Sequence, residues 1–145
     1  MMATRPTKKI NPLDLKKNTA IGIPFPLGGA PIFRSTMTTE EQALSNLKNL
    51  LLTRKGERPF QPLFGTDLPS FLFENITDEL IESLKGGLEK DIKFWLPYIK
   101  MKEIRVDTEA DNNRVNFSFS FSVGETGANK IIIVGIDEQG GLSIA

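Results

Sequence analysis

One segment of the chain, 115–123, alternates apolar and polar side chains without a break, and it restricts the possible folds more than any other feature. The odd positions are all apolar: Val115, Phe117, Phe119, Phe121 and Val123. The even positions are asparagine or serine. A two-residue repeat places the apolar side chains on one face of a β-strand and the polar ones on the other. The chain must therefore supply elements that cover one face of a sheet.

Two further segments have strand character. The segment 104–108 begins an earlier strand, and the Asp-Asn-Asn turn at 111–113 predicts that this strand pairs with 115–123 as an antiparallel hairpin. A third strand is expected over 131–136. One of its faces would carry Ile131 and Ile133, and the other Ile132, Val134 and Ile136. Because this strand is apolar at both parities, both of its faces need cover.

Two amphipathic helices are predicted before the strands. The first begins after Thr38, which precedes Glu41 in the spacing of a capping box, and Gly56 is its expected C-terminal cap. Its apolar stripe is Leu44, Leu47, Leu50 and Leu51. The second helix begins after Thr77 and is ended by Pro97, which disfavours helical geometry at the preceding residue. Its stripe recurs every four residues: Leu80, Leu84, Leu88, Ile92 and Leu96.

These elements predict an α+β fold, with two main helices packed on the apolar face of a small antiparallel β-sheet. A single helical turn is expected over 69–73, between the helices. Gly86 and Gly87 lie inside the second helix, where each costs about 1 kcal/mol relative to alanine. We interpret the two glycines as the place where this helix packs closely on the sheet.

The first part of the chain differs from the rest in composition. Residues 1–34 carry six basic residues against one acidic residue, a net charge of +5, together with five prolines. This composition favours an extended arm that is either a solvated tail or ordered on a partner. Nucleic-acid binding is not expected, because Phe25 and Phe33 are not interleaved with the basic cluster. The predicted boundaries are 1–37 for the arm and 38–145 for the α+β domain.

A dense loop, 54–66, connects the first helix to the helical turn. It contains two prolines and two glycines, which exclude regular structure, yet its apolar residues indicate that it folds back on the body. We expect Phe60 and Phe64 to anchor it to the helices. Three basic residues would then project as a fixed edge: Arg54, Lys55 and Arg58. The alternative is that this loop only closes the fold.

The chain contains neither cysteine nor histidine, which excludes most common types of enzyme active site. Without them there are no disulfides, no thiol nucleophiles, and neither the commonest general base nor the commonest transition-metal ligand. No apolar run approaches the roughly 18 residues of a membrane-spanning helix, and no signal peptide is visible. We therefore expect no metal, no cofactor and no membrane partner, and a chain that folds in a cytoplasm.

The remaining hydrolytic scheme is a carboxylate pair of the glycosidase type. The pairs to consider are Glu57 with Asp67 and Glu74 with Asp78. The sequence contains no spacing that would set the distance between two carboxyl groups, and nothing marks one acid as buried. We interpret these acids as surface or capping residues and expect no catalytic residue.

The segments 47–68 and 72–75 resemble the baseplate wedge subunit of T4-like contractile phage tails. The resemblance covers about 44–123, and the string Arg-Lys-Gly-x-Arg-Pro-Phe-x-Pro-x-Phe-Gly at 54–65 carries most of it. This family, also called the sheath initiator and long described as lysozyme-like, includes a baseplate component of type VI secretion systems. The resemblance implies a structural protein, present in several copies around a sixfold baseplate.

Such a protein would join other baseplate wedge subunits and template the first ring of tail sheath subunits, in the virion after assembly in the host cytoplasm. In the family, a Glu-Pro-Arg element after the long helix contacts the wedge core bundle. The matching place here is Leu96-Pro97-Tyr98, where the proline is kept and both charges are absent. We therefore expect an apolar contact through Leu96 and Tyr98. The alternatives are a carboxylate-dependent tail muramidase and a regulatory binding protein on the same fold.

Three segments are thus expected to bind partners. The loop would contribute Arg54, Lys55, Gly56, Glu57, Arg58, Pro59, Phe60 and Phe64. The segment after the long helix would contribute Leu96, Pro97 and Tyr98. The last strand would contribute Ile131, Ile132, Ile133 and Val134. As an exposed edge it would accept a strand from a sheath subunit, the alternative being a strand buried within its own monomer.

Overall fold

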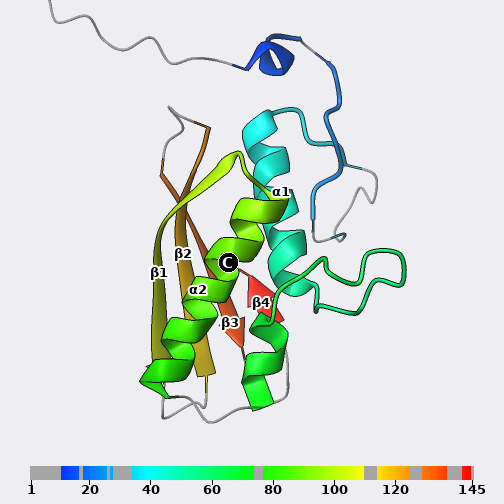
Figure 1. The fold of residues 1–145 in the computed structure, drawn as a ribbon. Coiled ribbons are helices and arrows are strands. Elements are labelled where there is room, and N and C mark those ends of the chain that lie inside the picture. Colours follow the sequence, from blue (N-terminus) through cyan, green and yellow to red (C-terminus); the bar gives the residue numbers. More distant parts are fainter. Residues whose placement is uncertain are drawn as a thin grey trace, which may run out of the picture.

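Four antiparallel strands build one sheet in the order β1-β2-β3-β4. Their bounds are Ile99–Glu109 for β1, Arg114–Val123 for β2, Lys130–Ile136 for β3 and Leu142–Ile144 for β4. The predicted hairpin is confirmed, since β1 and β2 pair in an antiparallel register that sets Ile104 opposite Phe119. The short strand β4 was not predicted, and it pairs with the second half of β3, Val134 to Ile136. Figure 1 shows the helices on one face of this sheet, which confirms the α+β fold.

This structure is a computed structural model. It describes residues 11–16, 18–25, 27, 34–73, 77–109, 114–124, 129–136 and 142–144. Within these ranges, none of the helices combines the length and the apolar composition needed to cross a membrane.

Strand β1 begins at Ile99, earlier than the predicted start at Ile104. The reason is that Pro97 ends the helix before it and the chain enters the sheet after only a short turn, 97–98. Leu96 adopts a non-helical conformation, with φ −129° and ψ 63°. The backbone N–H of Ile99 then donates to the carbonyl oxygen of Leu96 at 2.9 Å. The proline therefore sets the start of a strand as well as the end of a helix.

Helix α1 spans Thr39–Leu52 and begins as predicted, because the hydroxyl of Thr38 accepts the N–H of Glu41 at 3.2 Å. The predicted end at Gly56 is wrong. The helix ends four residues earlier, where the hydroxyl and the N–H of Thr53 both donate to the carbonyl oxygen of Asn49, at 2.6 Å and 3.2 Å. Thr53 itself is extended, with ψ 127°, so the chain leaves the helix there.

Helix α2 spans Asp78–Trp95, and its predicted cap is confirmed by the hydroxyl of Thr77, which accepts the N–H of Leu80 at 3.2 Å. The predicted helical turn is also present, as the 3-10 helix η2 (Leu68–Phe73). The interpretation of the two glycines is wrong. A Cβ atom built on Gly86 or Gly87 meets nothing within 4 Å, so neither glycine permits a close approach to the sheet.

The core lies between the sheet and the helices. Three phenylalanines of β2, Phe117, Phe119 and Phe121, are fully buried, and the ring of Phe71 in η2 meets that of Phe117 at 5.7 Å between centroids. The helices contribute Leu47, Leu50, Leu51, Leu84, Leu88 and Ile92. The odd positions of β2 therefore form the covered face that the alternation predicted, with Val123 at the margin.

The described part of the N-terminal arm lies against α1. It includes a 3-10 helix, η1 (Pro12–Leu15), so the arm is not extended throughout. The carboxylate of Asp14 accepts the N–H and the hydroxyl of Thr39, both at 2.8 Å. Further along, Gly22 and Thr36 form an antiparallel bridge. This part of the arm is therefore ordered on its own domain.

Candidate partner-binding surface

The loop 54–66 is closed at its base by backbone contacts. Arg54 and Thr66 form a parallel bridge, and the N–H of Thr66 donates to the carbonyl oxygen of Thr53 at 2.9 Å. Gly65 has φ +122°, and a Cβ atom on it would stand 2.5 Å from the same Thr53 oxygen. A side chain at this position would therefore be both strained and in a clash. Only glycine fits the closure, which explains this part of the sequence motif.

Hydrogen bonds also hold the interior of the loop. Gly56 has φ +87°, and its N–H donates to the carbonyl oxygen of Pro62 at 2.7 Å across the loop. The carboxylate of Glu57 accepts the N–H of Arg54 at 3.0 Å, and the N–H of Gln61 donates to the carbonyl oxygen of Arg58 at 3.2 Å. The loop therefore has a defined shape without regular secondary structure, as Figure 1 shows in green beside α1.

Phe64 anchors the loop to the helices, as predicted. Its ring meets that of Trp95 in α2 edge to face, at 5.2 Å between centroids. On its other side the guanidinium of Arg58 lies 4.1 Å from the ring centroid, a cation–π contact. Nη2 of Arg58 also donates to Oδ1 of Asn49 in α1 at 3.0 Å. The inner side of the loop is thus filled by Phe64 and Arg58.

The predicted role of Phe60 as a second anchor is wrong. Its side chain is 99% exposed, and that of Leu63 is 75% exposed. Arg58 takes the position against the helices that Phe60 was expected to fill. The hydrogen bond from the N–H of Gly56 to the carbonyl oxygen of Pro62 encloses 57–61, and Leu63 follows directly after this bond. We call 59–63 the tip of the loop. The tip of the loop therefore presents apolar side chains to solvent.

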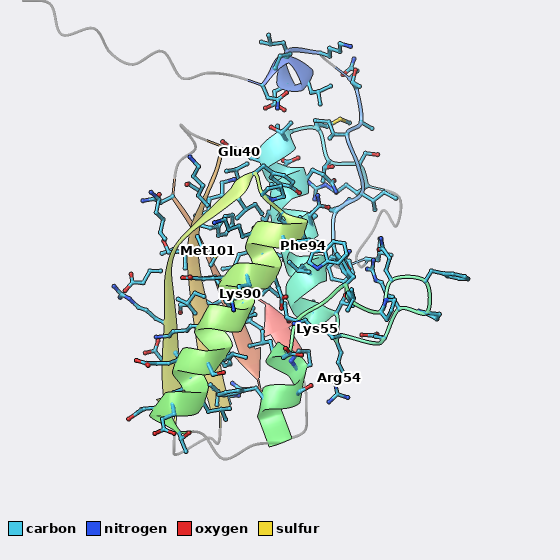
Figure 2. The ribbon with its side chains drawn as sticks, viewed as in Figure 1. Glu40, Arg54, Lys55, Lys90, Phe94 and Met101 are labelled. Carbon is cyan, nitrogen blue, oxygen red and sulfur yellow. The ribbon has the colours of Figure 1, made fainter. Side chains whose placement is uncertain are left out.

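The expected projecting basic edge does not form. Nζ of Lys55 lies 2.7 Å from Oδ2 of Asp91 in α2 and 3.1 Å from Oδ2 of Asp67. Burial alone would lower the pKa of Lys55, but the hydrogen bonds to Asp91 and then Asp67 outweigh it and raise this pKa above its ordinary value. Nε of Arg54 donates to Oγ of Ser70 at 3.2 Å. Figure 2 shows Arg54 and Lys55 at the base of the loop, where Lys55 fastens the loop to α2 and Arg54 stays exposed.

The segment after α2 is divided between core and surface. Leu96 is buried in the core, so the expectation that it contacts a partner is wrong. Tyr98 is partly exposed, and its hydroxyl accepts Nδ2 of Asn46 at 2.8 Å. Phe94, which the sequence analysis did not single out, is 75% exposed and meets Trp95 at 5.0 Å between ring centroids. Its place two residues after the buried Ile92, off the apolar stripe, was the available signal.

The structure joins two of the three predicted segments. A chain of ring contacts runs from Phe94 to Trp95 and on to Phe64, so the end of α2 and the loop are in contact. The exposed apolar residues of these two segments are Phe60 and Leu63 in the loop, and Phe94 and Tyr98 at the end of α2. The third segment belongs to the sheet.

Strand β3 is buried on one face only. Ile132 and Val134 are buried in the core, whereas Ile131 is 67% and Ile133 42% exposed. The alternative of a strand buried within its own monomer is therefore wrong for this face, and its expected cover would have to come from another protein. The opposite edge of the sheet, formed by β1, is less suited to accepting a further strand. The outer strand β1 has a register irregularity between Met101 and Glu103, together with charged side chains, two features that discourage strand addition.

The acids considered for catalysis are engaged elsewhere or exposed. The carboxylate of Glu57 accepts a backbone N–H, and that of Asp67 pairs with Lys55. Asp78 occupies the first turn of α2, and Glu74 lies outside the described residues. A cavity of about 150 Å³ between η2 and α2 includes Asp67 and Asp91 in its lining. Among the residues with described positions, no cluster of acids is placed to hold a metal ion.

Comparison with known proteins agrees with the fold. The family model for the baseplate wedge protein gp25 matches residues 38–128. The baseplate wedge protein gp25 of Enterobacteria phage T4 is 36% identical over 84 residues, which are 55% of this chain and 64% of that protein. The matched segment therefore spans less than two thirds of this relative.

Solved structures with the same fold include a protein of Geobacter sulfurreducens provisionally named a tail lysozyme. Its TM-score is 0.63 at 19% identity, over 72% of this chain and 95% of that one. A chain of the sixfold-symmetrised baseplate of the anti-feeding prophage has a TM-score of 0.61 at 24% identity, over 71% of this chain and 84% of that one. At such identities the similarity establishes the fold alone.

Proposed function

The chain belongs to the family of the baseplate wedge protein gp25, and on this premise we propose that it is a structural protein that joins wedge subunits and templates the first ring of the tail sheath. It acts by binding, in several copies around a sixfold baseplate, and it is incorporated into the virion after assembly in the host cytoplasm. The family match over 38–128 supports the assignment to the baseplate. Two exposed apolar regions support the two binding roles.

The joining role is assigned to the end of α2. The family's charged Glu-Pro-Arg element is replaced here by Leu96-Pro97-Tyr98, and exposed aromatic residues stand at this place instead. Phe94 and Tyr98 supply the apolar contact, in place of the buried Leu96. An apolar contact requires an apolar surface on the neighbouring wedge subunit, because a charged surface would lose its hydration without gaining an ion pair.

The templating role is assigned to β3, and the observation that carries it is the exposed apolar pair Ile131 and Ile133. Strand β4 pairs with Val134 to Ile136 and not with the first half of β3. A strand from a sheath subunit would continue the line of β4 along that first half. Main-chain hydrogen bonds would supply affinity, and the isoleucines would set the register.

The test changes the exposed face of β3. Replacing Ile131 and Ile133 by threonine should leave the melting temperature unchanged and abolish sheath nucleation on assembled baseplates, seen by electron microscopy. The control is a serine-to-alanine change at Ser118, opposite Ile133 on the neighbouring strand, which should have no effect. Normal sheath nucleation by the double isoleucine variant would contradict the templating role.

Two alternatives are tested by activity and by assembly. A carboxylate-dependent muramidase would clear a peptidoglycan suspension and lose that activity in Glu57→Gln. We expect no clearing, because the Glu57 carboxylate already accepts a hydrogen bond from the backbone N–H of Arg54. A regulatory binding protein on the same fold would fail to co-purify with co-expressed wedge subunits, whereas a wedge component should co-purify with them.

A further inference from the structure

The tip of the loop exposes two large apolar side chains close together in sequence. Phe60 and Leu63 are among the most exposed hydrophobic residues that the structure describes. Single exposed hydrophobic residues are common on protein surfaces and need no explanation. The tip differs because its backbone is held at two points, by the closure at Gly65 and by the hydrogen bond from Gly56 to Pro62.

A fixed tip matters because binding usually costs conformational entropy. A loop that must be ordered by its partner loses part of the interaction free energy in that ordering. Here Arg58, Phe64 and Lys55 already hold the loop against α1 and α2 before any partner is present. An aromatic side chain such as Phe60 can bury roughly 150 to 250 Å² when it enters a pocket. Because the loop is already ordered, most of the binding free energy from burying this area would be retained.

We propose that Phe60 and Leu63 form a two-residue anchor that inserts into an apolar pocket on a neighbouring protein subunit of the wedge. This inference rests on the proposed function, and it assigns to the loop tip a contact separate from that of Phe94 and Tyr98. Interface residues of this kind act as hot spots when their pocket is fully desolvated. Pro59 and Pro62 border the tip and restrict its backbone further.

The charges around the tip favour a protein pocket over a lipid surface. A loop that inserts into a membrane usually carries free basic residues that hold anionic headgroups. In this loop the ammonium group of Lys55 is paired with two aspartates, and the guanidinium of Arg58 is turned inward to Asn49. Glu57 adds a negative charge near the tip. Arg54, at the base of the loop, is exposed. The loop therefore presents one exposed cation and not the basic cluster of a membrane anchor.

The test uses the purified full chain and a wedge subcomplex made by co-expressing the other wedge genes of the same tail. Phe60→Ala should weaken binding at least tenfold, and Leu63→Ala should weaken it severalfold, with unchanged melting temperatures. The matched control is Leu15→Ala, because Leu15 in η1 is similarly exposed, at 67%, and lies in the arm. This control should bind like the unmodified chain.

A photo-crosslinker at position 60 provides the second measurement. Phe60→benzoylphenylalanine in the assembled wedge should crosslink to apolar residues of one wedge protein, whereas the same group at the exposed Lys90 of α2 should not. Binding by Phe60→Ala within twofold of the unmodified chain would overturn the anchor and leave the proposed function intact. Phe60-dependent binding to phosphatidylglycerol vesicles, without an effect on wedge binding, would also overturn it. If the unmodified chain failed to bind the subcomplex, the proposed function itself would fail.

Discussion

Strand β3 and the loop 54–66 both place exposed apolar side chains beside buried ones, but they do so by different physical means. In β3, Ile131 and Ile133 alternate with the buried Ile132 and Val134, as the geometry of a strand requires. In the loop, Phe60 points to solvent while Phe64, four residues later, packs on Trp95. No repeat in the sequence relates these two phenylalanines.

The difference shows where orientation comes from. A strand that covers a core fixes the direction of every second side chain, so the two sets can be separated from the sequence, although not which set is inward. In an irregular loop, each side chain competes for the space against the body. Here Arg58 takes that space, because it reaches both the ring of Phe64 and the amide of Asn49. Phe60 is consequently left outside.

The largest effect should separate the two faces of β3. Replacing Ile132 and Val134 together by threonine buries hydroxyl groups without partners in the core and should cost about 3 to 5 kcal/mol of unfolding free energy. The same change at Ile131 and Ile133 should cost less than about 1 kcal/mol. Urea unfolding of the free chain measures both. Equal losses would show that the exposed face is covered within the monomer.

A second pair of variants tests whether the loop closure at Gly65 is rigid. Gly65→Ala puts a side chain at φ +122° against the Thr53 carbonyl and should destabilise the chain by about 2 kcal/mol or more. Gly86→Ala is the control, since its Cβ would meet nothing within 4 Å. It should stabilise α2 by up to about 1 kcal/mol. If thermal unfolding ranked the two alanines in the opposite order, the loop closure would not be rigid.

Within the loop, the two phenylalanines should respond differently to truncation. Phe64→Ala removes the ring contact with Trp95 and the partner of Arg58, and should cost about 1 to 2 kcal/mol. Phe60→Ala should change stability by less than about 0.5 kcal/mol, because the side chain is exposed. Differential scanning calorimetry distinguishes them. A comparable loss from Phe60→Ala would mean that Phe60 packs on the body after all.

The smallest effect concerns the base of the loop. Lys55→Met leaves Asp67 and Asp91 without their shared cation and should cost up to about 1 kcal/mol, reduced by the partial exposure of the pair. The pKa of Lys55 is raised in the folded chain, so its contribution is fully present below the ordinary value of 10.5 and is lost as the pH rises through the folded pKa. Unfolding between about pH 7 and 9 should therefore show a constant difference from the unmodified chain.

The elements that depend on local chemistry can be predicted from the sequence alone. Thr38 and Thr77 began the two helices where their hydroxyls cap backbone N–H groups, and the alternation of β2 identified the buried face with its phenylalanines. The apolar run of β3 was also recognised as a strand. These features can be read from the sequence because caps and strand periods involve residues only a few positions apart.

The features that depend on competition between distant residues become visible in the folded chain. Helix α1 ended before Gly56 because the chain at Thr53 and Arg54 is drawn into a bridge with Thr66. Strand β4 formed because β3 offered it a partner, and three residues of pattern are too few to signal a strand in advance. Phe60 was left exposed because Arg58 and Phe64 filled the inner side of the loop. In each case several residues could occupy the same position in the fold, and the sequence does not show which of them does.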